Sequence, residues 1–205
     1  MENEKVIVAA TGNAHKLAEI EAITAQLGLK VITKAQAGAG DLDVEETGTT
    51  FEENSLLKAE AIMKATGLPA IADDSGLETD ALNGAPGVYS ARFSGEDATD
   101  ASNNEKLLQM MADVPDAERG ARFVSVVTLC YPDGTVLAAR GECPGTILRE
   151  LRGDGGFGYD PLFLPEGFDR TYAQITAEEK NSISHRARAL EGLKKQLETY
   201  IADKR

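Results

Sequence analysis

The first 33 residues constrain the fold most, because they read as a strand, a glycine turn, a helix and a second strand. Residues 5–10 are β-rich, and Thr11-Gly12-Asn13 follows them. A helical period comes next, and Gly28 is placed to end it. Its apolar stripe contains Leu17, Ile20, Ile23 and Leu27. Residues 30–33 read as the second strand, and this order is the usual opening of an α/β domain.

A second helix and strand follow an acidic loop at residues 41–48. Thr50 and Glu53 have the spacing of a capping box, which predicts a helix that runs to about residue 65 and ends at Gly67. The apolar residues 70–72 then predict a buried strand.

The second half of the chain indicates antiparallel pairing. Residues 123–131 and 136–140 are β-rich runs joined by a Pro-Asp-Gly-Thr turn, which is a strong hairpin signal. Helices are expected at residues 103–112 and from about Ser184 to the end. The expected fold is therefore α/β, with a mixed central sheet flanked by helices. The simplest arrangement is one domain over residues 1–205, made of two lobes with a substrate cleft between them.

The charge of the chain limits its partners. Its 205 residues have a formal net charge of −13, and such a surface repels nucleic-acid backbone and anionic lipid. No apolar run approaches the ~20 residues needed to cross a bilayer. No signal peptide is visible, and Cys130 and Cys143 read as reduced thiols. We therefore expect a cytoplasmic protein that binds neither nucleic acid nor membrane.

Two adjacent carboxylates, Asp73 and Asp74, follow the apolar strand at residues 70–72. Side chains alternate across a strand, so at the end of this strand the two would point to opposite faces. Buried anions are costly unless a metal or hydrogen-bond donors meet them. A cation site at the carboxyl end of the strand is one interpretation, and an ordinary Asp-Ser-Gly turn is the alternative.

The turn at residues 11–16 joins a strand to a helix N-terminus. Unpaired N–H groups and the helix dipole favour a phosphate there. Gly12 permits close approach, Thr11 and Asn13 can donate hydrogen bonds, and Lys16 adds charge. The alternative is an ordinary Asn cap beside a surface lysine.

Acidic and basic side chains around the second helix could complete a metal site. Glu45 and Glu46 with Asp74 would supply the carboxylates of a Mg²⁺ site, which commonly uses one or two of them with substrate phosphates. Lys58 could reach phosphate. The alternatives are a solvated acidic loop and a lysine paired with its neighbours.

The glycine-rich loop at residues 153–158 leads into Phe157-Gly158-Tyr159-Asp160, where an aromatic ring could stack on a base. A core-anchoring aromatic is the alternative. Lys180 and the pair His185-Arg186 lie near the last helix, and no second His or Cys is near enough in sequence to suggest zinc.

The order of these motifs resembles the inosine triphosphate pyrophosphatase family, also called Ham1. The matching segments span nearly the whole chain. They are Thr11-Gly12-Asn13 with Lys16, residues 45–48, residues 51–54 with Lys58, residues 72–77, 84–92 and 155–161, Glu179-Lys180, and residues 184–186.

The resemblance implies hydrolysis of non-canonical purine triphosphates (ITP, dITP and XTP) to the monophosphate and pyrophosphate, which would cleanse the nucleotide pool. Asp74 would ligate Mg²⁺ and accept a proton from the attacking water, with Glu46, or less surely Glu45, also near the metal. A homodimer is implied too. The residues that would contact substrate are Thr11, Gly12, Asn13, Ala14, His15, Lys16, Lys58, Ser75, Phe157, Gly158, Tyr159, Asp160, Lys180, His185 and Arg186.

Two other functions compete with this one. A Maf-like pyrophosphatase would act on pyrimidine or modified nucleotides. A nucleotide sensor would bind without catalysis, but Glu46 and Asp74 argue against it, because binding alone needs no activated water.

Overall fold

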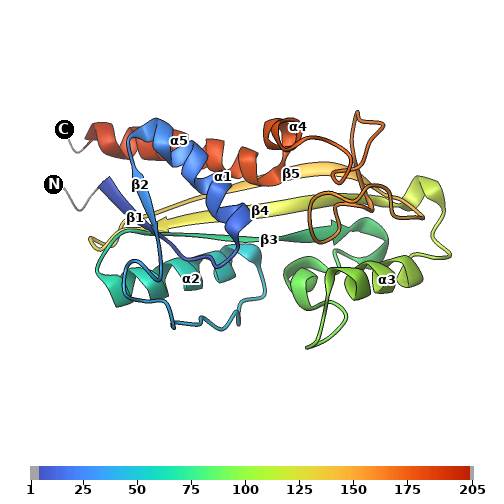
Figure 1. The fold of residues 1–205 in the computed structure, drawn as a ribbon, viewed down its shortest axis with the longest axis horizontal. Helices are drawn as coiled ribbons and strands as arrows, with labels where there is room; N and C mark the ends of the chain where they lie inside the picture. Colours follow the sequence, from blue (N-terminus) through green and yellow to red (C-terminus); the bar gives the residue numbers. More distant parts are fainter. Residues whose placement is uncertain (1–4, 204–205) are drawn as a thin grey trace. The chain divides into compact units, whose positions relative to one another are not determined.

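The computed structural model describes residues 5–203, except the side chains of His15, Ile23 and Leu27. Its helices and strands alternate as far as β4, after which two more strands and then two helices follow, with short 3-10 helices between some of the elements (Figure 1). Their order is β1 (Val6–Ala9), α1 (Ala14–Thr24), β2 (Lys30–Thr33), α2 (Phe51–Thr66), β3 (Ala70–Thr79), α3 (Asp100–Met110), β4 (Gly120–Cys130), β5 (Val136–Ile147), β6 (Phe163–Pro165), α4 (Ala177–Ile183) and α5 (His185–Asp203).

The strands form a six-stranded mixed sheet, which confirms the predicted fold class. Their order is β2-β1-β3-β4-β5-β6. β1 pairs in parallel with β2 and with β3, whereas β5 and β6 are antiparallel. The pairing β1–β2 is the parallel step predicted by the strand, turn, helix and strand at the start of the chain.

The chain divides into two compact units. Unit 1 comprises Met1–Asp74, Ser125–Gly141 and Arg186–Arg205, and unit 2 comprises Ser75–Val124 and Glu142–His185. The strands β3, β4 and β5 each contribute residues to both units. The cleft predicted between two lobes from the organisation of the sequence stays a prediction.

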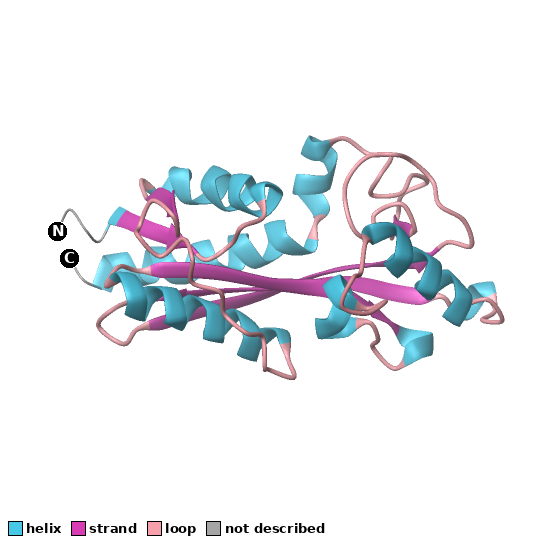
Figure 2. Ribbon diagram, turned by 60° about the horizontal axis from the view of Figure 1, so that its bottom comes forward, coloured by secondary structure: helices cyan, strands magenta, loops and turns pink. Residues whose placement is uncertain are grey.

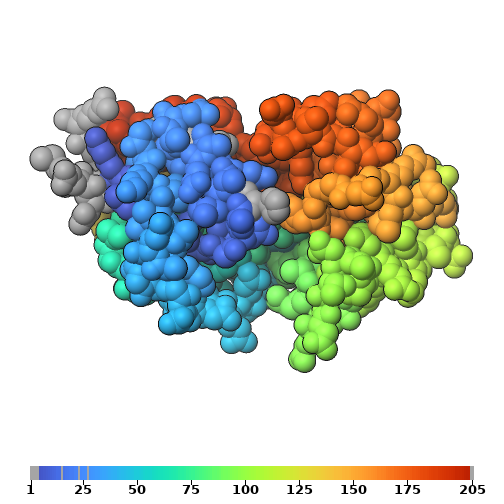
Figure 3. All heavy atoms as spheres, in the orientation of Figure 1, coloured from blue at the N-terminus to red at the C-terminus, as the bar shows by residue number. Residues whose placement is uncertain are grey.

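Strand alternation builds two apolar layers in unit 1, and helices cover both faces of its part of the sheet (Figures 1 and 2). Ile7 and Ile71 pack with apolar residues of α1 and α5, whereas Val8 packs with Ile62 of α2. The last helix, α5, thus packs with residues of β1 and α1, and its red atoms border blue atoms on the surface (Figure 3). The residues of β3 that follow Ile71 and Ala72 continue the same alternation between the two faces.

Unit 2 has one main core, in which α3 and the aromatic residues of the second half of the chain pack together. Leu107 of α3 belongs to it, as do Phe123, Phe163 and Tyr172. The Phe123 and Phe163 rings make an edge contact with centroids 4.7 Å apart. This core supports the loop that carries Phe157 and the helix α4, which carries Lys180.

The structure corrects one predicted strand and adds two elements that the sequence did not predict. The strand predicted at residues 70–72 continues to Thr79, so Asp73 and Asp74 lie within β3 and do not form a turn. Its second half is held by burial, since Leu77 is fully buried. The structure also adds β6 and α4, both too short to give a periodic pattern.

Two other expectations concern the whole described chain. Within residues 5–203, no helix combines the length and apolar character that crossing a membrane requires. Cys130 and Cys143 are both buried free thiols, as the sequence predicts.

Candidate active site

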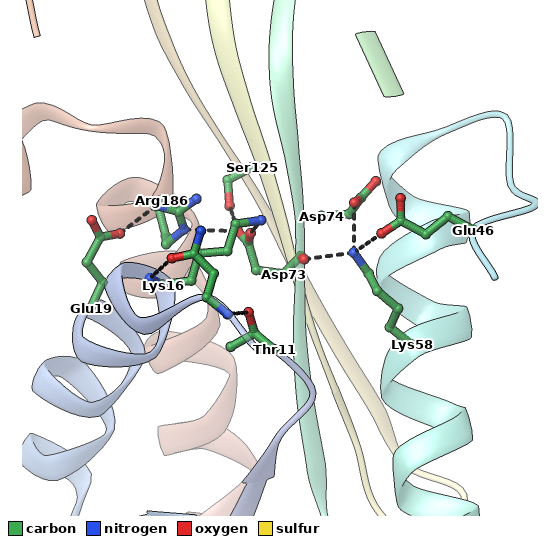
Figure 4. A network of polar contacts seen from close by, with 10 residues as sticks. Thr11, Lys16, Glu19, Glu46, Lys58, Asp73, Asp74, Ser125 and Arg186 are labelled. Carbon is green, nitrogen blue, oxygen red and sulfur yellow. Dashed lines mark hydrogen bonds and ion pairs between the residues drawn. The ribbon is translucent and has the colours of Figure 1, made fainter. Parts of the chain in front are cut away.

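Asp73 and Asp74 point to opposite faces of β3, as strand alternation predicts (Figure 4). Asp73 shares its face with Ile71 and meets Lys16 of α1. Asp74 shares its face with Ala72 and meets Lys58 of α2. β1 ends at Ala9, opposite Ile71, so both carboxylates lie just past the end of that strand. The polar site therefore begins where the parallel pairing stops.

Asp73 is the centre of a buried ion-pair network in unit 1. Its side chain is fully buried, and its Oδ2 lies 2.6 Å from Lys16 Nζ. Its Oδ1 accepts hydrogen bonds from Ser125 Oγ and from Arg186 Nε, the latter at 3.2 Å. Arg186 also forms an ion pair with Glu19 of α1, in which its Nη1 lies 2.7 Å from Glu19 Oε2.

The charges in this network decide the protonation of Asp73. Burial alone would raise the pKa of its carboxyl, but Arg186 and Lys16 hold that pKa well below its usual value. Asp73 is therefore an anion that ties Lys16 and Arg186 to β3.

Lys58 is the centre of a second network on the other face of β3. Its Nζ lies 2.8 Å from Asp74 Oδ1, 2.7 Å from Glu46 Oε1 and 3.0 Å from the Asp73 carbonyl oxygen. Burial alone would lower the pKa of Lys58, but Asp74 and Glu46 outweigh it and raise the pKa. The lysine is therefore a fixed cation among three oxygens.

Asp74 retains capacity for a metal ion. Its Oδ2 is buried and has no hydrogen-bond partner among residues 5–203. Burial raises the pKa of Asp74, and Lys58 offsets this only in part. A buried carboxylate oxygen without a partner suits a cation ligand or a proton acceptor.

The carboxylates present fit Mg²⁺ bound together with a phosphate, not a closed protein cage. Within the described residues, no group of three or more His, Cys, Asp or Glu side chains could hold a metal ion. Asp74 and Glu46 approach the same ammonium, so two carboxylates converge, and Mg²⁺ commonly takes one or two with substrate phosphates and water. Glu45 is exposed in the same loop.

The N-terminus of α2 holds the acidic loop in place. The capping box of Thr50 and Glu53 is present as predicted. Asn54 is fully buried, and its Oδ1 accepts the Gly48 N–H at 2.8 Å. A Cβ at Gly48 would come within 2.6 Å of that oxygen, so only glycine fits. Glu46 thus lies two residues before Gly48, whose position this hydrogen bond fixes.

The predicted phosphate turn lies at the N-terminus of α1. Asn13 Oδ1 caps the helix by accepting the Lys16 N–H at 3.2 Å, and Thr11 Oγ1 accepts the Asn13 N–H at 3.1 Å. Gly12 and Ala14 are exposed, and the His15 side chain lies outside the described residues. The cap that was the alternative interpretation is present, and the exposed turn still leaves room for an anion.

Unit 2 brings the predicted Lys180, Phe157 and Asp160 together. Lys180 Nζ lies 2.5 Å from Asp160 Oδ2, 4.7 Å from the centroid of the Phe157 ring and 5.0 Å from that of Tyr172. Asp160 Oδ2 also accepts the Phe157 N–H at 3.0 Å. One buried carboxylate thus holds both the cation and the loop that carries the aromatic ring.

Three more of the residues predicted to contact substrate are His185, Tyr159 and Ser75. His185 stacks on Phe123 with ring centroids 4.9 Å apart. Tyr159 OH donates to the Ser90 carbonyl at 2.8 Å. Ser75 is a partly buried residue of β3, next to Asp74.

A comparison with known protein families decides to which family the chain belongs. A model of the Ham1 family matches residues 7–196. The chain belongs to the Ham1 family. A dITP/XTP pyrophosphatase of Shigella flexneri is 53% identical over 186 residues, covering 90% of this chain and 93% of the relative. One from Streptomyces coelicolor is 50% identical, covering 91% and 94%.

Solved structures agree with this membership. The Ham1 protein of Staphylococcus aureus superposes with a TM-score of 0.87 at 43% identity, covering 96% of this chain and all of that one. A nucleoside-triphosphatase / dITP/XTP pyrophosphatase of Mycobacterium abscessus gives a TM-score of 0.78 at 45% identity, covering 92% and 98%.

Several residues of these two groups, the Asp73 network in unit 1 and the Lys180 contacts in unit 2, were not predicted as site residues. Ser125 and Glu19 complete the Asp73 network, and Tyr172 contacts Lys180. Ser125 interrupts the apolar run of β4, which is the one sequence signal that pointed to it. Glu19 looks like any exposed helix acid, so the sequence carried no signal for its role.

Proposed function

We propose that this protein hydrolyses non-canonical purine nucleoside triphosphates (ITP, dITP and XTP) to the monophosphate and pyrophosphate, with Mg²⁺ as cofactor. The names of its relatives support the substrate class. The observation that carries the chemistry is Asp74, whose Oδ1 is held by Lys58 while its buried Oδ2 has no partner within residues 5–203.

In this proposal the residues of unit 1 act on the triphosphate. Lys16 and the α1 N-terminus bind phosphate oxygens, and Asp73 keeps Lys16 in position. Asp74 and Glu46 hold Mg²⁺. When bound, the ion supplies positive charge that offsets repulsion between the triphosphate and an acidic protein.

Asp74 accepts the proton of the water that attacks the α-phosphorus. Burial raises the pKa of its carboxyl, which makes it a better proton acceptor than an exposed aspartate. Pyrophosphate leaves as the bond between the α and β phosphates breaks. Positioning and charge neutralisation do most of the work in such transfers.

The residues of unit 2 are proposed to recognise the base. Phe157 offers a ring for stacking, and Lys180 is a charged donor that Asp160 holds beside it. A 6-keto oxygen accepts from such a donor, whereas the 6-amino group of adenine would leave it unpaired, and such mismatches discriminate strongly. Arg186, which is buried and paired with Asp73, is proposed to contact the substrate near the base.

The test is product identification. The protein is incubated with ITP, XTP, GTP and ATP, with Mg²⁺ or with excess EDTA. We expect ITP and XTP to give monophosphate and pyrophosphate, and EDTA to stop the reaction. Orthophosphate and a diphosphate as products would overturn the assigned bond. A preference for pyrimidine triphosphates would favour the Maf-like alternative.

The assembly and location belong to the same proposal. We propose a cytoplasmic homodimer that has no nucleic-acid or membrane partner, in line with the net charge of −13. Light scattering of the purified protein tests the dimer, and a mass of one chain would contradict it.

A further inference from the structure

Lys58 holds the same carboxylates that are proposed to hold Mg²⁺. Its ammonium touches Asp74 Oδ1 at 2.8 Å and Glu46 Oε1 at 2.7 Å (Figure 4). The Asp73 carbonyl oxygen completes a cradle of three oxygens. Three oxygens from three separate residues are a set that suits a cation.

The ammonium has little freedom to leave this cradle for solvent. The Lys58 side chain is only 14% exposed, and that of Asp74 is 9% exposed. The ammonium is held by ion pairs with two carboxylates, at 2.7 Å from Glu46 and 2.8 Å from Asp74. Screening by water is weak in such a place, and charges there interact strongly.

A divalent cation and this ammonium oppose each other. A cation that takes Asp74 and Glu46 as ligands either displaces Nζ from their oxygens or binds beside it. Displacement breaks two charge-assisted hydrogen bonds, and binding beside Nζ places like charges together. Both routes weaken the metal site while Lys58 has no other anion to bind.

We propose that Lys58 antagonises divalent-cation binding in the nucleotide-free protein and thereby makes metal affinity depend on the triphosphate. This inference rests on the proposed metal site at Asp74 and Glu46. A triphosphate supplies new anionic oxygens for the ammonium, which releases the carboxylates to the metal. Metal and nucleotide then bind with positive coupling, and the coupling is reciprocal.

The experiment measures Mn²⁺ binding without turnover, by the loss of the free Mn²⁺ signal in electron paramagnetic resonance. Lys58→Met removes the charge at nearly constant length, and Lys58→Gln is a second neutral variant. Lys58→Arg keeps the charge. Lys64→Met is the matched control, because Lys64 lies on the same helix in an exposed pair with Glu60. Thermal melts check that each variant is folded.

Without nucleotide, we expect both neutral variants to bind Mn²⁺ at least about tenfold more tightly than the wild type. Lys58→Arg and Lys64→Met should stay within about threefold of it. With an α,β-methylene analogue of ITP, Mn²⁺ affinity should rise more in the wild type than in Lys58→Met. This would be the signature of coupling that runs through Lys58.

Equal or weaker Mn²⁺ binding by folded neutral variants overturns the inference. So does an equal effect of the analogue on the wild type and Lys58→Met. The double variant Asp74→Asn/Glu46→Gln separates the two levels of the proposal. If it binds Mn²⁺ as the wild type does when the analogue is present, the proposed metal site itself fails, and the role of Lys58 fails with it.

Discussion

Asp73 and Asp74 are neighbours in sequence, yet their surroundings shift their pKa values in opposite directions. Arg186 and Lys16 lower the pKa of Asp73, whereas burial raises that of Asp74. Pairs of carboxyls with separated pKa values commonly have separate roles in a site. We therefore propose that Asp73 positions Lys16 and Arg186 and that Asp74 accepts the proton.

Replacement of Asp74 tests its assigned role. Asp74→Asn keeps the shape of the side chain but removes the proton acceptor, so kcat for ITP should fall by about 10²–10⁴-fold. Stability should change little, because burial of the charged form is itself unfavourable at this position. Kinetics and thermal melts at neutral pH measure both effects. Near-normal turnover in the variant would show that another group accepts the proton.

Replacement of Asp73 should instead cost stability. Asp73→Asn leaves Lys16 and Arg186 with a neutral partner, and breaking a buried ion pair costs about 3–5 kcal/mol. Arg186 and Lys16 hold the folded-state pKa of Asp73 well below its ordinary value of 3.8. Its contribution is therefore complete above about pH 4, and it is lost as pH falls through the folded pKa.

Urea denaturation between pH 8 and pH 3 measures this contribution. The difference between wild type and Asp73→Asn should be constant down to about pH 5 and shrink below pH 4. Asp116→Asn is the control, because Asp116 is 83% exposed in a pair with Arg149. A control loss as large as that of Asp73→Asn would mean that burial of the pair is not the cause.

The sequence predicts some residues of the site better than others. Alternation in β3 is a local rule, so the opposite directions of Asp73 and Asp74 follow from it. The partners of Asp73 come from three distant segments, and local patterns cannot show which charges meet. Arg186 and Asp160, predicted to contact substrate, both lie in buried ion pairs, and their contact with substrate stays a prediction.

At the scale of elements, local signals predicted most of the longer helices and the strands next to turns, but they missed α4, although a capping box at Thr176 begins it. The capping box at Thr50 and the left-handed Gly28 and Gly67 mark helix ends as predicted. The extension of β3 to Thr79 was missed because its polar residues look like a turn. Pairing with neighbouring strands and burial overrode that local preference.

One helix of unit 2 controls the loop that carries Phe157. Asp100, in the first turn of α3, accepts the Gly158 N–H at 2.7 Å. Asn104, one turn later, donates to the Gly158 carbonyl at 2.8 Å and is only 4% exposed. The backbone N–H and the carbonyl of Gly158 are thus both hydrogen-bonded to side chains of α3. The helix fixes the loop next to the aromatic ring.

Asn104→Ala should therefore relax base selection. Loss of the buried hydrogen bonds costs about 1–3 kcal/mol of stability. A looser loop should lower the ratio of kcat/KM for ITP to that for ATP by about tenfold, since about 1.4 kcal/mol is one factor of ten. Kinetics with both nucleotides measure the ratio.

The neighbouring amide provides the control for this change. Asn103 is equally buried but binds Ser90, Ala91 and Ser94, not the glycine-rich loop. Asn103→Ala should lower stability and leave the ITP to ATP ratio within about twofold. An equal fall of the ratio in both variants would attribute it to general loosening of unit 2.

At the scale of the whole molecule, the net charge of −13 acts against an anionic substrate. The lysines proposed to bind phosphate do not offset this at a distance, because Lys16 and Lys58 are each paired with a carboxylate. An approaching triphosphate therefore meets a negative field until it reaches the site. Divalent cations bound to the triphosphate reduce its negative charge before it contacts the protein.

The salt dependence of kcat/KM tests this field. At fixed free Mg²⁺, raising NaCl from about 10 to about 150 mM shortens the screening length from about 30 Å to about 8 Å. Since the long-range force is repulsive, kcat/KM for ITP should rise by about twofold or more over this range. Inhibition by the monophosphate, which carries less charge, should change less. A steady fall of kcat/KM with salt would show instead that local attraction by Lys16 and Lys58 dominates the approach of the substrate.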